Sequence, residues 1–461
     1  MEIQFLGATK GVTGSCYSLS LGNEKLFIDC GMFQGDKDSE RLNYQSFKVN
    51  PREYSALLLT HAHLDHCGRI PLLVNEGFNG KIYATDATKA LAFIVMADSA
   101  KIAMEDVRNE NKRRARENLP QRKPIFSMED VTKAMRLFKP IKYGDLVKVT
   151  DNFSAKFYDA GHILGSSSIQ VIANDKGVEK KIVFSGDLGN KETILVRKTE
   201  FIKDADYVLM ESTYGDRLHE SLVSRKGELI RIVKETFNRG GKLMIPSFAI
   251  ERTQELLFYL DELMTEGIIP KMPVFLDSPM AIRATEVFKK FTKYFNNDVQ
   301  NRLKTDSDVF GFPGLKMTMG RTDSMEINTL NEPCIIIAGS GMCTAGRIKH
   351  HIVNNIEDEK NTLLFIGFQV EGTLGAHIKS GEKRIRLLGR EVDVKSKIEV
   401  IEGFSAHADR EGLNNWLNYF SKKPKVFLIH GDSEQKLALS KKLIEKGFEI
   451  TIPSYEEIIK L

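Results

Sequence analysis

Histidine is scarce in this chain, with ten in 461 residues, yet three of the ten lie within six positions. The segment 60–66 reads THAHLDH and contains His61, His63, Asp65 and His66. It follows an apolar run at residues 55–59 that is typical of a buried strand. In an extended segment alternate side chains point the same way, so His61 and His63 would face one point. Asp65 and His66 come where the chain turns and would face a second point nearby. A polar loop whose histidines bind nothing is the alternative, but three of ten histidines in one loop favour a metal site.

Imidazole and carboxylate ligands together suit zinc better than calcium or magnesium. The loop therefore offers two imidazoles to one cation, and a carboxylate with an imidazole to another. Two further segments hold a potential ligand each: His162 in DAGHILGS at 159–166, and Asp187 in IVFSGDLG at 182–189. Taken singly, each also fits an ordinary role, as a hydrogen-bonded loop histidine or as an aspartate in a turn before glycine.

The composition is that of a globular protein, with 42% hydrophobic and 28% charged residues, and the length predicts two or three domains. The formal net charge of +4 is small for this length, so it neither supports nor excludes a nucleic-acid partner. Five cysteines without a CxxC pair predict a reducing compartment and no disulfide framework. We expect a cytoplasmic protein with no membrane contact, because we find neither a signal-peptide pattern nor an apolar run of membrane-spanning length.

The pattern of the first 190 residues predicts short strands interrupted by one long helix. Glycine turns separate the strands up to about residue 85, and a hairpin turn is expected at residues 21–24. The helix is expected from Asp86 to about Glu117, and Ser127 with Asp130 resembles a capping box that opens another helix. The far end of the long helix is rich in basic residues. A solvated helix end is the simpler interpretation and an RNA-contacting patch the other; the residues are Arg113, Arg114, Arg116, Arg122 and Lys123.

Past residue 205 the pattern changes to a repeat of strand, small-residue loop and helix. Such alternation predicts a parallel sheet with helices on both faces. Short strands return in the last part of the chain, so the second domain is expected to be inserted into the first. The four repeated strands are predicted at 242–246, 274–277, 335–338 and 363–366, and the returning strands at 398–401, 426–429 and 449–452.

With His162 and Asp187, the HxHxDH segment resembles the metallo-β-lactamase fold. That family also carries an aspartate at the end of an early strand, matched here by Asp29 in LFIDCG at 26–31. The resemblance implies an α/β fold, the αββα sandwich, with Asp29 holding a ligand in orientation. It also implies a zinc-ligand set in which Asp187 bridges two ions: His61, His63 and His162 on one, and Asp65 and His66 on the other.

Three more segments resemble the signature motifs of the β-CASP branch of this superfamily: ESTYG at 211–215, FSAHAD at 404–409 and IHGD at 429–432. This resemblance implies an inserted parallel-sheet α/β (β-CASP) domain at 209–392, between metallo-β-lactamase segments at 1–208 and 393–461. His430 resembles the RNA-processing members and would complete the second zinc. Neither ion requires His407, so it is expected to act as a general acid or phosphate contact, with Glu211 orienting its ring.

The resemblance therefore implies a ribonuclease with two Zn²⁺ ions per chain that hydrolyses single-stranded RNA. Members of the branch leave a 5′-phosphate and a 3′-hydroxyl, and both endonucleases and 5′-exonucleases occur among them, as do homodimers. Alternatives are a hydrolase of small esters or thioesters on the same fold, a non-catalytic RNA-binding subunit, and a DNA nuclease, which His430 disfavours.

The loops that follow the strands of the inserted domain are expected to contact the substrate. Loops after parallel strands gather at one edge of the sheet, and helix N-termini there favour phosphate. Phe248 could stack on a base and Arg252 could hold a phosphate. Ordinary capping or core packing is the alternative for each of these residues. The remaining candidates are Ser278, Pro279, Ser340, Gly341 and Met342, in loops expected to open helices, with Ser278 as an N-cap before a first-turn proline.

Overall fold

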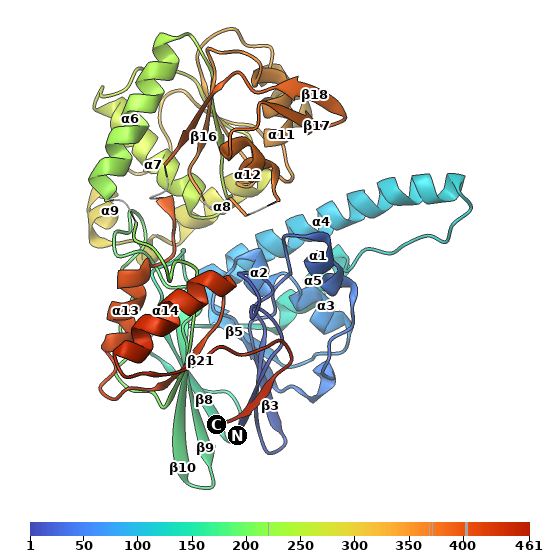
Figure 1. Cartoon of the computed structure of the whole chain (residues 1–461), viewed down its shortest axis with the longest axis vertical. Helices are drawn as coiled ribbons and strands as arrows, with labels where there is room; N and C mark the ends of the chain where they lie inside the picture. The colour runs from blue at the N-terminus through green and yellow to red at the C-terminus, as the bar shows by residue number, and fades with distance from the viewer. Residues whose placement is uncertain (220, 368, 371, 402–403) are drawn as a thin grey trace. The chain divides into compact units, whose positions relative to one another are not determined.

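The computed structural model describes residues 1–219, 221–367, 369–370, 372–401 and 404–461 (Figure 1). It divides into two compact units. Unit 1 contains Met1–Thr193, Arg197–Leu218 and His407–Leu461, and unit 2 contains Ile194–Val196 and His219–Ala406. The chain therefore leaves unit 1 and later returns to it. The main divisions, at 218/219 and 406/407, come later in the chain than the 208/209 and 392/393 boundaries expected from the sequence.

Unit 1 contains two seven-stranded sheets within the described residues. The first has the spatial order β22 (Ile458–Lys460), β1 (Glu2–Phe5), β2 (Tyr17–Leu21), β3 (Glu24–Ile28), β4 (Ala56–Leu58), β5 (Lys81–Thr85) and β6 (Phe138–Ile141). The second has the order β21 (Glu449–Thr451), β20 (Lys425–Leu428), β11 (Tyr207–Met210), β10 (Val178–Phe184), β9 (Ser167–Asp175), β8 (Phe153–Asp159) and β7 (Leu146–Lys148).

The two sheets of unit 1 share one hydrophobic core. Phe5 and Leu26 of the first sheet belong to the same buried cluster as Phe157, Val171 and Phe184 of the second. Apolar side chains from facing sheets bury each other's surface, which is the main stabilising contribution in such a sandwich.

Helices cover the outer faces of the sandwich, so the predicted αββα fold is confirmed (Figure 1). On the second sheet, Leu413 and Leu439 from two of these helices pack against Val208 and Val426. The helices of unit 1 are α1 (Lys37–Arg41), α2 (Leu64–Cys67), α3 (Ile70–Asn75), α4 (Asp86–Arg116), α5 (Met128–Leu137), α13 (Arg410–Asn418) and α14 (Ser433–Glu445), with short 3₁₀ turns at Leu42–Tyr44 and Pro51–Glu53.

Local sequence signals account for the two helices that were predicted in unit 1. The hydroxyl of Thr85 caps α4 by accepting the Thr88 backbone N–H at 3.1 Å. Ser127 and Asp130 form the reciprocal capping box at the start of α5. Both predicted helices are confirmed, and α4 ends within one residue of the predicted end.

Unit 2 is built around a sheet of six parallel strands among the described residues. Its order is β14 (Leu315–Met317), β13 (Val274–Leu276), β15 (Ile335–Ala338), β12 (Leu243–Pro246), β16 (Thr362–Phe365) and β19 (Lys397–Val400), and β17 (Arg384–Leu387) forms a separate hairpin with β18 (Arg390–Asp393). Its helices are α6 (Leu222–Asn238), α7 (Arg252–Thr265), α8 (Pro279–Lys290), α9 (Asn297–Arg302), α10 (Arg321–Ile327), α11 (Ile348–Asn355) and α12 (Leu374–Lys379), with a 3₁₀ turn at Thr292–Tyr294.

The four strands expected from the repeat all lie in this parallel sheet, as predicted. One assignment was wrong. The strand expected at 398–401 was grouped with the returning strands of the first domain, but β19 pairs in parallel with β16 of unit 2. Its partner is set by tertiary packing, which the short apolar run of the strand does not reveal.

Candidate metal centre

The first group of potential ligands joins three loops of unit 1. His61 and His63 follow β4, His162 follows β8, and Asp187 follows β10. The Nε2 atom of His61 lies 3.1 Å from Nδ1 of His63, which lies 3.2 Å from Nε2 of His162. The Oδ2 atom of Asp187 lies 3.4 Å from His61 Nε2 and 3.5 Å from His162 Nε2. Ligands about 2.0–2.1 Å from a tetrahedral zinc are about 3.4 Å apart, so these separations suit that ion.

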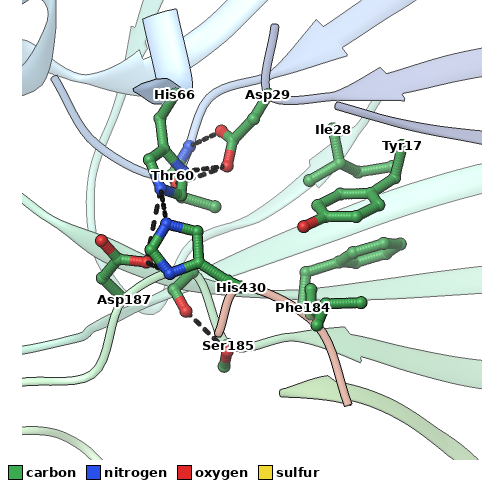
Figure 2. Close-up of a pocket in the computed structure, with 11 residues that line it drawn as sticks. Tyr17, Ile28, Asp29, Thr60, His66, Phe184, Ser185, Asp187 and His430 are labelled. Atoms are coloured by element: carbon green, nitrogen blue, oxygen red, sulfur yellow. Dashed lines mark hydrogen bonds and ion pairs between the residues drawn. The ribbon is translucent and has the colours of Figure 1, made fainter. Parts of the chain in front are cut away.

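A second group lies beside the first and shares Asp187. The Nε2 atom of His66 is 3.3 Å from Nε2 of His430, which is 3.2 Å from Oδ2 of Asp65. The other carboxylate oxygen of Asp187, Oδ1, is 3.3 Å from His66 Nε2. Figure 2 shows Asp187 beside His66 and His430. Asp187 thus turns one oxygen toward each group, which is the arrangement that a bridging ligand needs.

The environment sets the protonation states that metal binding requires. Burial lowers the pKa of His61 and His162, and it lowers the pKa of His63 to about 3, so these three imidazoles are neutral at pH 7. Burial alone would raise the pKa of Asp187, but the surrounding histidines lower it well below its ordinary value. Neutral imidazoles and an ionised carboxylate are the forms that ligate a metal.

Two buried atoms of the site lack a hydrogen-bond partner among the described residues. They are Oδ1 of Asp187 and Nδ1 of His162. A buried carboxylate oxygen without a donor costs free energy, and a cation at this position would remove that cost. Burial also opposes charge on His66, yet the carboxylates of Asp187, Asp29 and Asp65 raise its pKa well above the ordinary value. The donor set and the surplus of negative charge therefore both fit metal ions.

Asp29 and Thr60 hold the histidines in orientation. The Nδ1 atom of His66 lies 2.7 Å from Oδ2 of Asp29, so its Nε2 faces the ligand group. The backbone N–H and the hydroxyl of Thr60 both donate to Asp29, at 2.7 Å each. A carboxylate behind a histidine fixes its ring and raises its basicity as a ligand.

Thr60 and Thr213 were missed at the sequence level. The hydroxyl of Thr213 lies 3.2 Å from Nδ1 of His430, so it orients that ring as Asp29 orients His66. Both threonines stand in motifs that were singled out for other residues: Thr60 directly precedes His61, and Thr213 is the third residue of ESTYG. The sequence offered one signal for these roles, a hydroxyl residue within or directly beside a ligand motif.

Close backbone packing fixes the segment that carries Asp65 and His66. The carbonyl oxygens of these two residues accept the backbone N–H groups of Ser15 and Cys30, each at 2.8 Å. A Cβ atom at Gly31 would lie 1.6 Å from the carbonyl oxygen of Asp65. Only glycine allows this approach, and the short helix α2 is therefore held against the end of β3.

His407 and Glu211 form a pair beside the shared aspartate. The Nδ1 atom of His407 lies 3.1 Å from Oε2 of Glu211 and 4.0 Å from Oδ2 of Asp187. Glu211 is fully buried and also accepts the backbone N–H of Leu188 at 2.7 Å. Burial opposes charge on His407, but the neighbouring carboxylates outweigh it and raise its pKa to about 8. The carboxylates therefore favour the protonated form of this imidazole.

A small cavity lies between the second ligand group and the core. Tyr17 and Phe184 line one side, and His66, Asp187 and His430 line the other (Figure 2). Its volume of about 10 Å³ is near the lower limit for a single water molecule. The cavity is too small for a substrate and belongs to the packing behind the ligands.

In unit 2, several of the residues expected to contact substrate lie at the carboxyl edge of the parallel sheet. A Cβ atom at Gly341 would lie 2.6 Å from the ring of Phe248, so this ring packs against the Gly341 backbone. Phe248 is partly exposed. The hydroxyl of Ser278 caps α8 by accepting the Ala281 backbone N–H at 3.3 Å, and Pro279 is the first residue of that helix. Met342 lies beside Gly341 in the loop after β15.

Two expectations for these loops do not agree with the structure. Arg252 is buried and bound to Glu255 one turn later in α7, so its guanidinium group is not available to a phosphate. Ser340 opens no helix, because α11 begins only at Ile348, and its hydroxyl instead accepts the backbone N–H groups of Thr344 and Ala345. Only the Ser278 loop is a capped helix N-terminus as predicted.

Comparisons with known proteins agree with the fold. Three family models match the chain: a metallo-beta-lactamase superfamily domain at residues 18–212, a Beta-Casp domain at 253–378, and a Zn-dependent metallo-hydrolase RNA specificity domain at 391–453. A solved structure of a protein of unknown function from Enterococcus faecalis matches 100% of this chain and 99% of its own, with a TM-score of 0.56. At 14% identity that likeness concerns the fold alone.

Curated relatives match over nearly the entire chain. Ribonuclease TTHA0252 from Thermus thermophilus is 38% identical over 99% of both chains. Transcription termination factor FttA from Methanosarcina mazei is 30% identical over 97% of this chain and 69% of its own. Integrator complex subunit 11 from Danio rerio is 29% identical over 98% of this chain and 72% of its own.

The fold and the ligand groups define a metal-dependent hydrolase of the metallo-β-lactamase superfamily. Within that superfamily the chain belongs to the β-CASP family, as its motifs indicated. Among the described residues, every helix is too short or too polar to cross a membrane.

Proposed function

We propose that this chain is a zinc-dependent ribonuclease that binds two zinc ions and hydrolyses phosphodiester bonds of single-stranded RNA. One observation carries the proposal: two groups of ligand atoms share Asp187, and its two oxygens face different groups. The relative from Thermus thermophilus is named a ribonuclease, which supports RNA as the substrate. The free thiols of all five cysteines suit the cytoplasm.

When bound, a pair of zinc ions activates a water nucleophile and stabilises negative charge on phosphoryl oxygens. His61, His63 and His162 would hold one ion, and Asp65, His66 and His430 the other, with Asp187 contributing to both. Asp29, Thr60 and Thr213 keep three of these histidine rings in position.

His407 supplies the proton that the leaving oxygen requires. The Glu211 carboxylate raises the pKa of His407 and engages Nδ1, so Nε2 is the atom that would donate. Glu211 thereby fixes the ring orientation and stabilises the imidazolium ion.

Metal analysis of the purified chain tests the two-ion site. We expect about two zinc ions per chain, loss of RNA cleavage after chelation, and recovery when zinc is returned. Cleavage that persists in metal-free protein would exclude the mechanism.

Replacement of His407 tests the proton donor. His407→Ala should retain both zinc ions and cleave RNA about 10²- to 10⁴-fold more slowly. His377→Ala is a matched control, because His377 pairs with Glu382 at 2.8 Å on an exposed surface. An unchanged rate in His407→Ala would remove its catalytic role.

A further inference from the structure

The second half of α4 and the segment after it form an arm, residues 101–123, in which no residue is buried. Figure 1 shows this part of the helix (cyan) extending beyond the other elements of unit 1. The helix begins beside the metal centre, because the hydroxyls of Thr85 and Thr88 donate to the carbonyl oxygen of Gly165 at 2.8 and 2.7 Å. Gly165 lies in the loop that carries His162. At about 1.5 Å per residue, Arg113 is about 42 Å along the helix from Thr85.

The net positive charge of the protein lies at the tip of this arm. Residues 108–123 contain seven basic and two acidic side chains, a formal net charge of +5. The whole chain has a formal net charge of +4, so all other residues together carry −1. A surface that serves solubility alone usually mixes both signs, whereas here one sign is gathered at one end of one helix.

Four basic residues of the tip are exposed and make no ion pair or hydrogen bond with any described residue: Arg108, Lys112, Arg113 and Arg116. Arg108, Lys112 and Arg116 are spaced four residues apart, so they form a stripe on one helix face with a charge about every 6 Å. Cations in the last turn of a helix are stabilised by its dipole, but Arg108 lies two turns earlier. Repulsion within the stripe therefore has no compensating contact in the protein.

The tip is an ordered structure. Asn111 joins the helix to the returning segment through two hydrogen bonds with the backbone of Arg122, at 2.9 and 2.8 Å. The guanidinium group of Arg114 donates to the carbonyl oxygen of Pro120 at 2.6 Å. These contacts hold the charged stripe in place without covering it, which lowers the entropy cost of binding a partner.

We propose that the stripe Arg108, Lys112 and Arg116, together with Arg113 next to it in the chain, binds the phosphate backbone of RNA as a second contact, about 40 Å from the metal centre. The choice of RNA rests on the proposed ribonuclease function. A strand stacked at 3.4 Å per nucleotide would need about 12 nucleotides to reach from one contact to the other. The arm thus favours long RNA over short fragments and adds affinity without sequence preference.

The test compares two variants with equal loss of charge. In the arm variant, Arg108, Lys112, Arg113 and Arg116 are changed to Gln, which keeps helix propensity. In the control variant, four exposed lysines elsewhere in unit 1 are changed to Gln: Lys142, Lys203, Lys422 and Lys441. Fluorescence anisotropy measures Kd of the zinc-loaded protein for a 30-nucleotide phosphorothioate RNA, which resists cleavage, between 50 and 200 mM salt.

We expect Kd of the arm variant to rise roughly tenfold or more at 50 mM salt, and the slope of log Kd against log salt to fall by about 3. The control variant should stay within about twofold, since its exposed lysines lie outside the arm. A variant with Arg108→Lys, Arg113→Lys and Arg116→Lys should bind like the wild type, because charge is retained.

Equal Kd values for the arm and control variants would overturn the proposal, whether both change or neither does. Thermal unfolding of each variant shows whether it is folded, and kcat of the control variant on a cleavable 30-nucleotide RNA should stay within about twofold. If the wild type fails to cleave RNA while the arm variant still loses binding, the ribonuclease function is wrong and the arm contact remains.

Discussion

Asp187 of unit 1 and Asp277 of unit 2 are both buried aspartates that follow a strand, but their partners differ. Asp277 accepts hydrogen bonds from Arg347 at 2.6 Å, from Ser324 at 2.6 Å and from His351 at 2.7 Å. These donors outweigh burial, which would raise its pKa, and lower it below the ordinary value. Asp187 is surrounded by imidazoles and has one oxygen without a donor among the described residues.

The difference separates a structural carboxylate from one that requires an ion. Arg347 neutralises Asp277 inside the protein, so that network is complete without any ligand. No arginine or lysine pairs with Asp187 among the described residues, and the imidazole nitrogens around it lie 3.3–3.5 Å from its two carboxylate oxygens. The same substitution should therefore affect metal binding at Asp187 and folding stability at Asp277.

Asp187→Asn should produce the largest effect. It removes the one negative charge that both ligand groups share, so zinc content should fall well below two per chain and kcat/KM on RNA should fall by roughly 10³-fold or more, about 4 kcal/mol. Zinc analysis and RNA cleavage measure both results. Full zinc content with normal cleavage would show that Asp187 is not a bridging ligand.

Asp277→Asn should instead reduce stability and leave the metal centre intact. Breaking a buried ion pair costs about 3 kcal/mol or more, which lowers Tm by roughly 6–12 °C for a unit of this size. Zinc content should match that of the wild type. An unchanged Tm, or a loss of zinc equal to that of Asp187→Asn, would contradict the distinction between the two aspartates.

A feature of the structure can be predicted from the sequence when residues close together in the chain determine it. The metal-binding role of the loop with His61, His63, Asp65 and His66 could be predicted because its ligands are neighbours in the chain. Asp29, His162, Asp187 and His430 come from distant segments, and only the family motifs connected them. The roles of Thr60 and Thr213 depend on which ring each hydroxyl meets, which is a property of the folded chain.

The errors in unit 2 have the same origin. Arg252 was expected to hold a phosphate because arginines often do, but burial against Glu255 three residues later removes it from solvent. The partner of β19 was misjudged because a short apolar run fits either sheet. Strand order and burial are tertiary properties, while helix limits such as those of α4 follow from local periodicity and capping.

Asp29→Asn tests a carboxylate that affects metal binding through a histidine ring. It weakens the hydrogen bond that orients His66, and the zinc Kd should rise about 10- to 100-fold. Competition with a fluorescent chelator measures this Kd. Glu53→Gln serves as a control, because Glu53 pairs with Lys25 on an exposed surface. An unchanged zinc Kd in Asp29→Asn would mean that His66 needs no such support.

Asp159 provides a third case, a buried carboxyl whose nearby Arg197 does not offset the effect of burial. Burial raises its pKa to about 8; the Gly161 backbone N–H at 2.9 Å opposes the shift, and Glu200 adds to it. The folded protein therefore keeps this group protonated at pH 7, whereas the unfolded chain ionises it near pH 4. Its contribution to stability is complete below about pH 4 and is lost as pH rises toward 8.

Asp159→Asn, which stays neutral at every pH, should remove this dependence. The unfolding free energy of the wild type relative to the variant should fall by about 2–3 kcal/mol between pH 5 and pH 7, at most about 1.4 kcal/mol per pH unit. Thermal unfolding of both proteins across that range measures the difference. Parallel stability profiles would show that Asp159 is ionised in the folded state, and that Arg197 and the Gly161 N–H then outweigh the effect of burial.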